Sequence, residues 1–193
     1  MLNDASIRRA VHSKLLRRQH SDPKTLIIDE LGLEHGTSRV DLAAINGLIQ
    51  GYEIKSDADD LSRLPHQIKI YSRVLDKLTV VSGDRLASGC ESALPHWCGL
   101  VRCGVGPRGG KNFETIRPAR RNSEVKSLSV VMLLWRNEAV EALRQLGSSP
   151  ELLRKSRDIL YSEITGQLSH SEVRAIVVRA LKLRKGWRGL QQL

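Results

Sequence analysis

Three residues in the first third of the chain have the types and spacing of an oxygen-lined metal site: Asp41, Glu53 and Lys55. Glu53 and Lys55 are two positions apart, so on a strand they point to the same face. Between Asp41 and Glu53 lies Asn46-Gly47, a strong signal for a two-residue hairpin turn. Such a hairpin would pair Asp41 with roughly the residue before Glu53, close enough for a bulge to bring the two carboxylates together. With the carbonyl of Ile54, they would then surround one small space.

Carboxylate and carbonyl oxygens are the ligands that Mg²⁺ and Mn²⁺ prefer. Such an ion polarises a phosphodiester and lowers the pKa of a bound water, while Lys55 would orient that water or stabilise charge in the transition state. Glu-x-Lys alone is a weak motif. The alternative interpretation is a charge pair of Glu53 with Lys55 or Arg39 on a solvated sheet face.

The surrounding sequence predicts an α/β unit over residues 1–100. A helix at 4–19 precedes three strands at 25–31, 39–45 and 48–56, followed by a helix at 58–77 and a strand at 77–82. The first three strands should form an antiparallel meander. The last should lie parallel to a neighbour because a helix connects it. The expected fold therefore has a mixed central sheet.

The remainder of the chain divides in two. Residues 101–122 are rich in Gly, Pro and Arg, which predicts a basic loop and a boundary. Residues 123–193 have helical patterns, which give a C-terminal helical region with helices at 123–146, 150–165 and 170–185. Ser149 and Ser169 mark helix starts.

The net charge of +10 is unevenly distributed. Residues 101–193 carry 18 Lys and Arg against 8 Asp and Glu, whereas residues 21–100 carry 8 against 12. An acidic centre with basic flanks suits a cation-dependent site beside a polyanion, although a basic surface kept for solubility is the alternative. We expect DNA as the partner, with RNA left open. Candidate phosphate contacts, against the alternative of a solvated helix face, are Arg117, Arg120, Arg121, Lys182, Arg184, Lys185 and Arg188.

No signal peptide and no long apolar run is visible, so we expect a cytoplasmic protein with no membrane association. The three cysteines do not form an even-numbered disulfide framework. A zinc site from His96, Cys98 and Cys103 is the weaker alternative, because structural zinc normally takes four ligands at tighter paired spacing.

The order Asp41, then Glu53-Ile54-Lys55, resembles the PD-(D/E)xK nuclease superfamily, whose restriction-endonuclease-like core has an α-β-β-β-α-β order. Gln67 and Tyr71 are similar to the QxxxY motif of RecB-type members. Other segments, including Arg39-Val40-Asp41-Leu42 and Gly51-Tyr52-Glu53-Ile54-Lys55-Ser56, are similar to a small uncharacterised bacterial and phage family within that superfamily. The resemblance implies that Asp41 and Glu53 bind the metal and that Lys55 is the catalytic lysine. It also implies that Gln67 and Tyr71 position the DNA backbone or support the site.

The chain departs from the superfamily pattern at one position. Many members carry a glutamate on the first helix, but residues 4–19 contain none. We expect Glu30 to replace it as a catalytic metal ligand, with Arg39 as a nearby nucleic-acid contact. The alternative is that Glu30 is a turn carboxylate paired with Arg39.

These features predict a Mg²⁺-dependent (or Mn²⁺-dependent) deoxyribonuclease in a phage, mobile-element, defence or repair context. Two alternatives remain open: a catalytically silent nucleic-acid-binding module on the nuclease fold, and a subunit that needs a protein partner encoded nearby. A homodimer is also left open, since cleavage of both strands would suit one.

Overall fold

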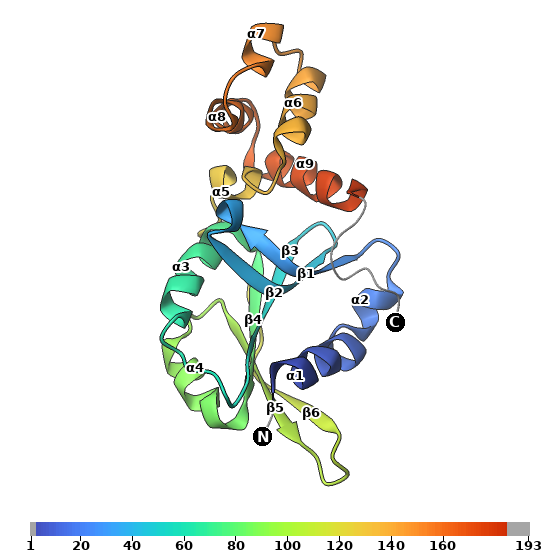
Figure 1. Cartoon of the computed structure of the whole chain (residues 1–193), viewed down its shortest axis with the longest axis vertical. Coiled ribbons are helices and arrows are strands. Elements are labelled where there is room, and N and C mark those ends of the chain that lie inside the picture. The colour runs from blue at the N-terminus through green and yellow to red at the C-terminus, as the bar shows by residue number, and fades with distance from the viewer. Residues whose placement is uncertain (1–2, 185–193) are drawn as a thin grey trace.

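The computed structural model describes residues 3–184, and its centre is one six-stranded sheet with the strand order β1-β2-β3-β4-β5-β6 (Figure 1). The first three strands are antiparallel, β3, β4 and β5 are parallel, and β6 is again antiparallel. The sheet is therefore mixed, as expected. The strands are β1 (Leu26–Leu33), β2 (Ser38–Ile45), β3 (Ile49–Lys55), β4 (Lys77–Gly83), β5 (Gly99–Val105) and β6 (Lys111–Arg117).

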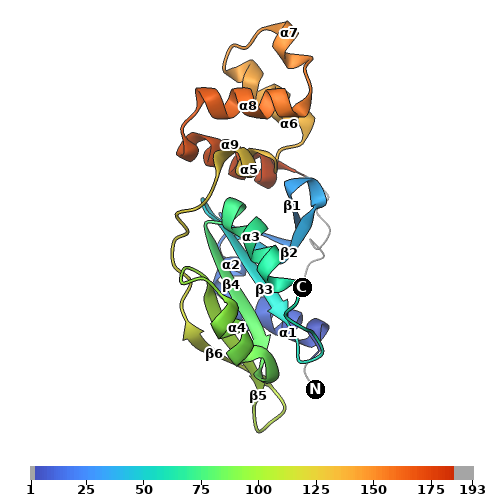
Figure 2. The same cartoon turned by 90° about the vertical axis from the view of Figure 1, so that its left-hand side faces the viewer.

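Helices cover both faces of this sheet (Figures 1 and 2). One face is covered by the N-terminal helices, which bury Ile7, Val11 and Leu16 against residues of the sheet such as Leu42 and Tyr52. These helices are α1 (Asp4–Ala10), the π-helix η1 (Val11–Leu15) and α2 (Arg17–Ser21). The predicted helix over 4–19 is thus present but contains a π turn, in which the Leu16 N–H donates to the Val11 carbonyl.

The opposite face is covered by α3 (Leu64–Val74) and α4 (Ala87–Ala93). Helix α3 begins six residues later than the predicted helix over 58–77, with Pro65 in its first turn, where a missing N–H costs nothing. A 3-10 turn, η3 (Asp84–Leu86), leads into α4. The connection through α3 makes β4 parallel to β3, as predicted.

The predicted meander is confirmed, but its second turn is one residue longer than expected. Ile45 pairs with Ile49, and the Asn46 N–H donates to the Leu48 carbonyl, so three residues rather than two form the turn. The pairing of Leu42 with Tyr52 consequently places Asp41 level with Glu53 rather than with the residue before it. The register therefore needs no bulge to bring the two carboxylates close together. A short 3-10 turn, η2 (Glu34–Gly36), connects β1 to β2.

The prediction of a basic loop over residues 101–122 is wrong, because most of this segment forms β5 and β6. Leu100, Val101 and Cys103 are buried in the sheet, which compensates for the poor strand propensity of the glycines. The glycines supply the hairpin turn, where Gly109 has a φ of 76° and the Gly106 N–H donates to the Gly110 carbonyl. The sheet thus extends to Arg117.

The C-terminal helical region is confirmed, and its described part, up to residue 184, forms five helices in place of the three predicted (Figure 2). The Ser149 and Ser169 side chains both accept a backbone N–H at a helix start, as predicted. Within residues 3–184, no helix is long and apolar enough to cross a membrane. The helices are α5 (Ser127–Val131), α6 (Arg136–Gln145), α7 (Pro150–Leu153), α8 (Arg157–Gln167) and α9 (His170–Leu183).

Candidate active site

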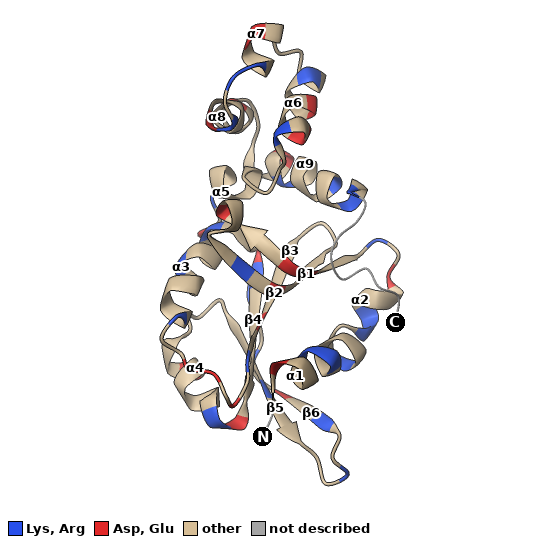
Figure 3. Cartoon of the chain, in the orientation of Figure 1, with Lys and Arg blue, Asp and Glu red and all other residues tan. Residues whose placement is uncertain are grey.

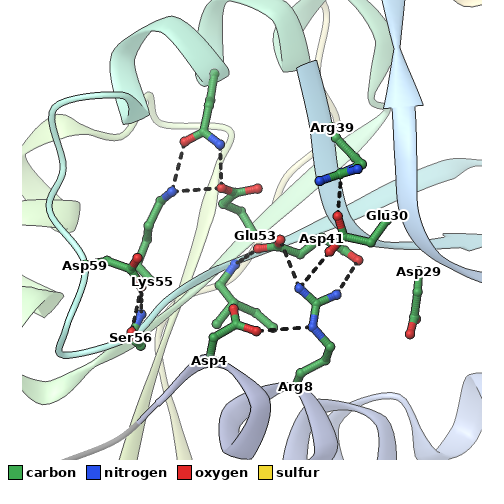
Figure 4. Close-up of polar contacts among 12 residues, drawn as sticks. Asp4, Arg8, Asp29, Glu30, Arg39, Asp41, Glu53, Lys55, Ser56 and Asp59 are labelled. Carbon is green, nitrogen blue, oxygen red and sulfur yellow. Dashed lines mark hydrogen bonds and ion pairs between the residues drawn. The ribbon is translucent and has the colours of Figure 1, made fainter. Parts of the chain in front are cut away.

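Glu53 is the centre of a hydrogen-bonded cluster that joins β3 to α3 (Figure 4). Lys55 Nζ lies 2.9 Å from Glu53 Oε1 and 2.9 Å from Gln67 Oε1. Gln67 Nε2 in turn donates to Glu53 Oε1 at 2.7 Å. Glu53 and Lys55 are both buried, at 2% and 5% exposed. A buried charge pair is stable only when its remaining hydrogen-bonding capacity is satisfied, which Gln67 does here.

Tyr71 completes the cluster from the same face of α3. Its hydroxyl lies 2.8 Å from Glu53 Oε2 and 2.8 Å from the Arg39 carbonyl, and Gln67 Nε2 donates to it at 3.3 Å. Burial, followed by the neighbouring Glu53 carboxylate, raises the pKa of Tyr71. The phenol therefore keeps its proton and acts as a donor to Glu53.

Asp41 lies beside this cluster on β2. Its Oδ2 accepts the Ile54 N–H at 2.7 Å, and its Oδ1 lies 3.1 Å from Arg8 Nη2. Burial is the largest cause that raises the pKa of Asp41 to about 7, and repulsion from Glu53 is the second; the Ile54 N–H and Arg8 oppose both. The structure thus brings Asp41, Glu53 and Lys55 together with Gln67 and Tyr71.

Arg8 on α1 is a member of the site that the sequence reasoning missed (Figure 4). Its guanidinium contacts Asp4 Oδ1 at 3.4 Å, Glu30 Oε1 at 2.9 Å and Asp41 Oδ1 at 3.1 Å. The sequence signal available was the Asp4 and Arg8 pair, four apart on the predicted first helix. That signal indicates a helix-surface ion pair and says nothing about Asp41.

Glu30 lies next to Asp41 but is held by two arginines. It forms ion pairs with Arg8 and with Arg39, the latter being the alternative raised from the sequence. Its φ is 59°, and the pairing of β1 with β2 passes from Asp29–Leu42 to Leu31–Val40 around it. A non-glycine residue in this region of the backbone is uncommon and marks a position constrained by its surroundings.

Asp41 and Glu53 supply the carboxylate oxygens that a divalent cation would need. Both Glu53 oxygens and both Asp41 oxygens have partners, of which Arg8 is the cation at Asp41. In residues 3–184 no group of three His, Cys, Asp or Glu side chains is placed to hold a metal ion. The mutual repulsion of Asp41 and Glu53 nevertheless favours a cation between them. Carboxylate oxygens are ligands of the kind that Mg²⁺ and Mn²⁺ prefer, and Arg8 contacts one of them at Asp41 Oδ1.

The other predicted phosphate contacts that the structure describes lie outside this site. Arg121 pairs with the buried Asp76, which accepts from Ile49 N at the opposite end of β3 from Lys55. Arg120 has an exposed side chain on the same segment, after β6. Arg117 donates to the Cys98 and Leu94 carbonyls. Lys182 donates to the Lys24 carbonyl, and Arg184 pairs with Glu138. Lys185 and Arg188 lie outside the described residues.

The three cysteines are free and buried. Burial raises the pKa of Cys98 to about 12, and it also raises the pKa of Cys103. A neutral, buried thiol is a poor metal ligand, since zinc binds the thiolate. The weaker alternative of a zinc site at His96, Cys98 and Cys103 therefore gains no support from the described part of the chain.

Comparison with known proteins gives a phage family. The sequence model described as Bacteriophage P4 protein cII matches residues 1–188. Protein cII of Enterobacteria phage P4 is 31% identical over 160 residues, which cover 82% of this chain and 59% of that relative. The matched residues thus cover less than two thirds of the relative's length. No solved structure matches this chain. The chain belongs to the bacteriophage P4 protein cII family.

Proposed function

We propose that this protein is a metal-dependent nuclease that hydrolyses DNA phosphodiester bonds. The observation that carries the proposal is the buried cluster of Glu53, Lys55, Gln67 and Tyr71 beside Asp41. A lysine and a carboxylate buried together at a strand end cost desolvation energy, and such an arrangement is typical of a functional site rather than of a core.

Each residue of the cluster then has a defined role. Asp41 and Glu53, with the Ile54 carbonyl, would hold Mg²⁺ or Mn²⁺, which neutralises phosphate charge and lowers the pKa of water when bound. Gln67 and Tyr71 hold the Glu53 carboxylate in one orientation by donating to different oxygens. They are positioning residues because their contacts act on Glu53.

Lys55 is the residue proposed to contact the reacting atoms. An ammonium group has three N–H donors, and two of the acceptors at Lys55 are Glu53 Oε1 and Gln67 Oε1. The third donor is available to a water or to a phosphate oxygen. A cation fixed in this way stabilises the charge that develops on phosphorus oxygens, with little reorganisation.

Exposed basic residues lie at the edge of the site and along the N-terminal helices, one of which carries Arg8. Arg39, 64% exposed, borders it through Glu30, and exposed Arg9, Lys14, Arg17 and Arg18 lie along the N-terminal helices (Figure 3). They supply the sequence-independent contacts that a DNA backbone needs. The family assignment to a phage protein is compatible with this substrate. RNA is the alternative substrate, and parallel assays on both polymers separate the two.

The test is cleavage of supercoiled plasmid and linear DNA by the purified chain with Mg²⁺ or Mn²⁺, stopped by EDTA. Lys55→Ala should lower the rate at least about 100-fold, because it removes the only side-chain cation of the buried cluster. Lys69→Ala is the matched control, since Lys69 is exposed on α3. Equal cleavage by wild type and Lys55→Ala would identify the activity as background and reject the proposal.

A second candidate function is a catalytically silent DNA-binding module, which the pairing of Arg8 with Asp41 and Glu30 favours. In that case Arg8 replaces the metal permanently. Tight, salt-sensitive DNA binding without metal-dependent turnover would support it. Turnover that appears only after a co-purifying phage protein is added would instead indicate a partner-dependent nuclease.

A further inference from the structure

One guanidinium lies among three carboxylates at the edge of the candidate active site. We propose that Arg8 is a built-in counter-cation, which occupies Asp41 Oδ1 of the proposed metal site and must be displaced before a divalent ion binds Asp41 and Glu53. Arg8 would thereby set the divalent-ion concentration at which the site is loaded. This inference rests on the proposed metal-dependent function and assigns a positioning residue to it.

The contacts of Arg8 are those of a bridging cation. A single nitrogen, Nη2, lies 2.9 Å from Glu30 Oε1 and 3.1 Å from Asp41 Oδ1. The second nitrogen, Nη1, donates to the Asp41 backbone carbonyl at 2.9 Å. The planar guanidinium therefore holds β1 and β2 together through the Glu30 and Asp41 carboxylates.

The charges around Asp41 explain why this position needs a cation. Glu53 has its own positive partner in Lys55, and Glu30 has a second one in Arg39. The oxygens of Asp41 contact only Arg8 and the neutral Ile54 N–H among the hydrogen bonds and ion pairs described. Arg8 is thus the positive side chain that balances Asp41. Because a guanidinium cannot be deprotonated in a protein, only displacement can remove that charge.

Arg8 also has a carboxylate partner outside the proposed metal site. Asp4, one turn earlier on α1, lies 3.4 Å from Arg8 Nε, and its side chain is 49% exposed. The Arg8 side chain itself is 20% exposed. Rotation of the side chain toward Asp4 would release Asp41 while keeping a carboxylate partner, without any movement of the α1 backbone. The Asp4 and Arg8 pair is therefore the resting position for the displaced guanidinium.

The test is a calorimetric titration of the purified chain with Mn²⁺ alone, without DNA. Arg8→Met should bind Mn²⁺ about tenfold more tightly than wild type, because the competing cation is gone. Arg8→Lys keeps the charge but loses the paired N–H donors of the planar guanidinium. Its affinity for Mn²⁺ should therefore lie between those of wild type and Arg8→Met. Arg9→Met is the matched control: Arg9 is the next residue on the same helix and is exposed, so a general change in charge would move both variants equally.

The outcomes separate the two proposals. Binding by Arg8→Met that is equal to or weaker than wild type, together with loss of binding in Asp41→Asn, overturns the role of Arg8 and leaves the metal site standing. Equal Mn²⁺ titrations of wild type and Asp41→Asn overturn the metal site and the role of Arg8 with it. If Arg8→Met unfolds without metal, the Arg8→Lys titration and the rise of its melting temperature with Mn²⁺, which should exceed that of wild type, decide the question.

Discussion

The Tyr71 hydroxyl donates to Oε2 of Glu53 at 2.8 Å, although the two residues are 18 positions apart and belong to different elements. The same hydroxyl lies 2.8 Å from the Arg39 carbonyl on β2. One side chain of α3 therefore connects two strands at the point where the candidate metal ligands meet. This contact ties the conformation of Glu53 to the packing of α3.

Tyr71→Phe should lower DNA cleavage about 10–100-fold, because the Glu53 carboxylate loses a donor that orients it. It should also destabilise the fold by about 1–3 kcal/mol, the usual effect of an unsatisfied buried group. Tyr161→Phe is the matched control, since its buried hydroxyl donates to the Leu134 carbonyl at 2.6 Å. It should lose similar stability in urea and keep wild-type cleavage; an equal loss of cleavage in both variants would contradict the role of Tyr71.

Asp41 predicts a pH dependence of stability in the absence of metal. Its pKa is raised from 3.8 to about 7, so between these values the folded protein binds more protons than the unfolded chain. The contribution of Asp41 to the free energy of unfolding is therefore fully present below the pKa that Asp41 has in the unfolded chain. It is lost as the pH rises through about 7. Asp41→Asn should abolish this dependence.

Melting temperatures at pH 5 and pH 8 measure the effect. The increase in melting temperature of Asp41→Asn relative to wild type should be larger at pH 8 than at pH 5. Asp158→Asn, at an exposed residue of α8, is the control and should show the same difference from wild type at both values. A gain for Asp41→Asn that does not change with pH would contradict the raised pKa.

Asp76 predicts how firmly the helical region is attached to the sheet. Its Oδ1 lies 3.0 Å from Arg174 Nη1 on α9 and 3.3 Å from Arg121 Nη2, while its Oδ2 accepts from Ile49 N. Arg174→Met should cost about 2 kcal/mol, since Asp76 is 1% exposed and loses a charged partner. Arg121→Met should cost less than about 0.5 kcal/mol because that side chain is 52% exposed. Urea unfolding of the two variants gives the comparison, and equal losses would contradict it.

The inclusion of β5 in the sheet predicts different sensitivities at two valines of that strand. Val101 is 4% exposed and Val105 is 56% exposed. Val101→Asp should destabilise the protein by about 3 kcal/mol or more, because it buries an unpaired charge. Val105→Asp should change stability by less than about 0.5 kcal/mol. Similar tolerance of both substitutions in thermal unfolding would indicate that this segment is a loop after all.

The elements that form because of residues close together in the sequence could be predicted. Alternation and turn residues indicated β1, β2 and β3 as a meander, and the spacing of Gln67 and Tyr71 indicated one face of α3. The serine caps at Ser149 and Ser169 were found in the same way. The segment 101–122 was not, because its many glycines mask a strand whose burial comes from β4.

By itself, the sequence determined that Glu53 and Lys55 share one strand face and that a hairpin returns the chain to Asp41, since side-chain alternation and turn chemistry act over a few residues. Only the tertiary structure decided the exact register of that hairpin and the position of Arg8, which lies 33 residues before Asp41. Docking of α1 on the sheet brings the two together, and no local pattern encodes that contact. The carboxylates of the site could therefore be predicted from the sequence, whereas the arginine that neutralises them could not.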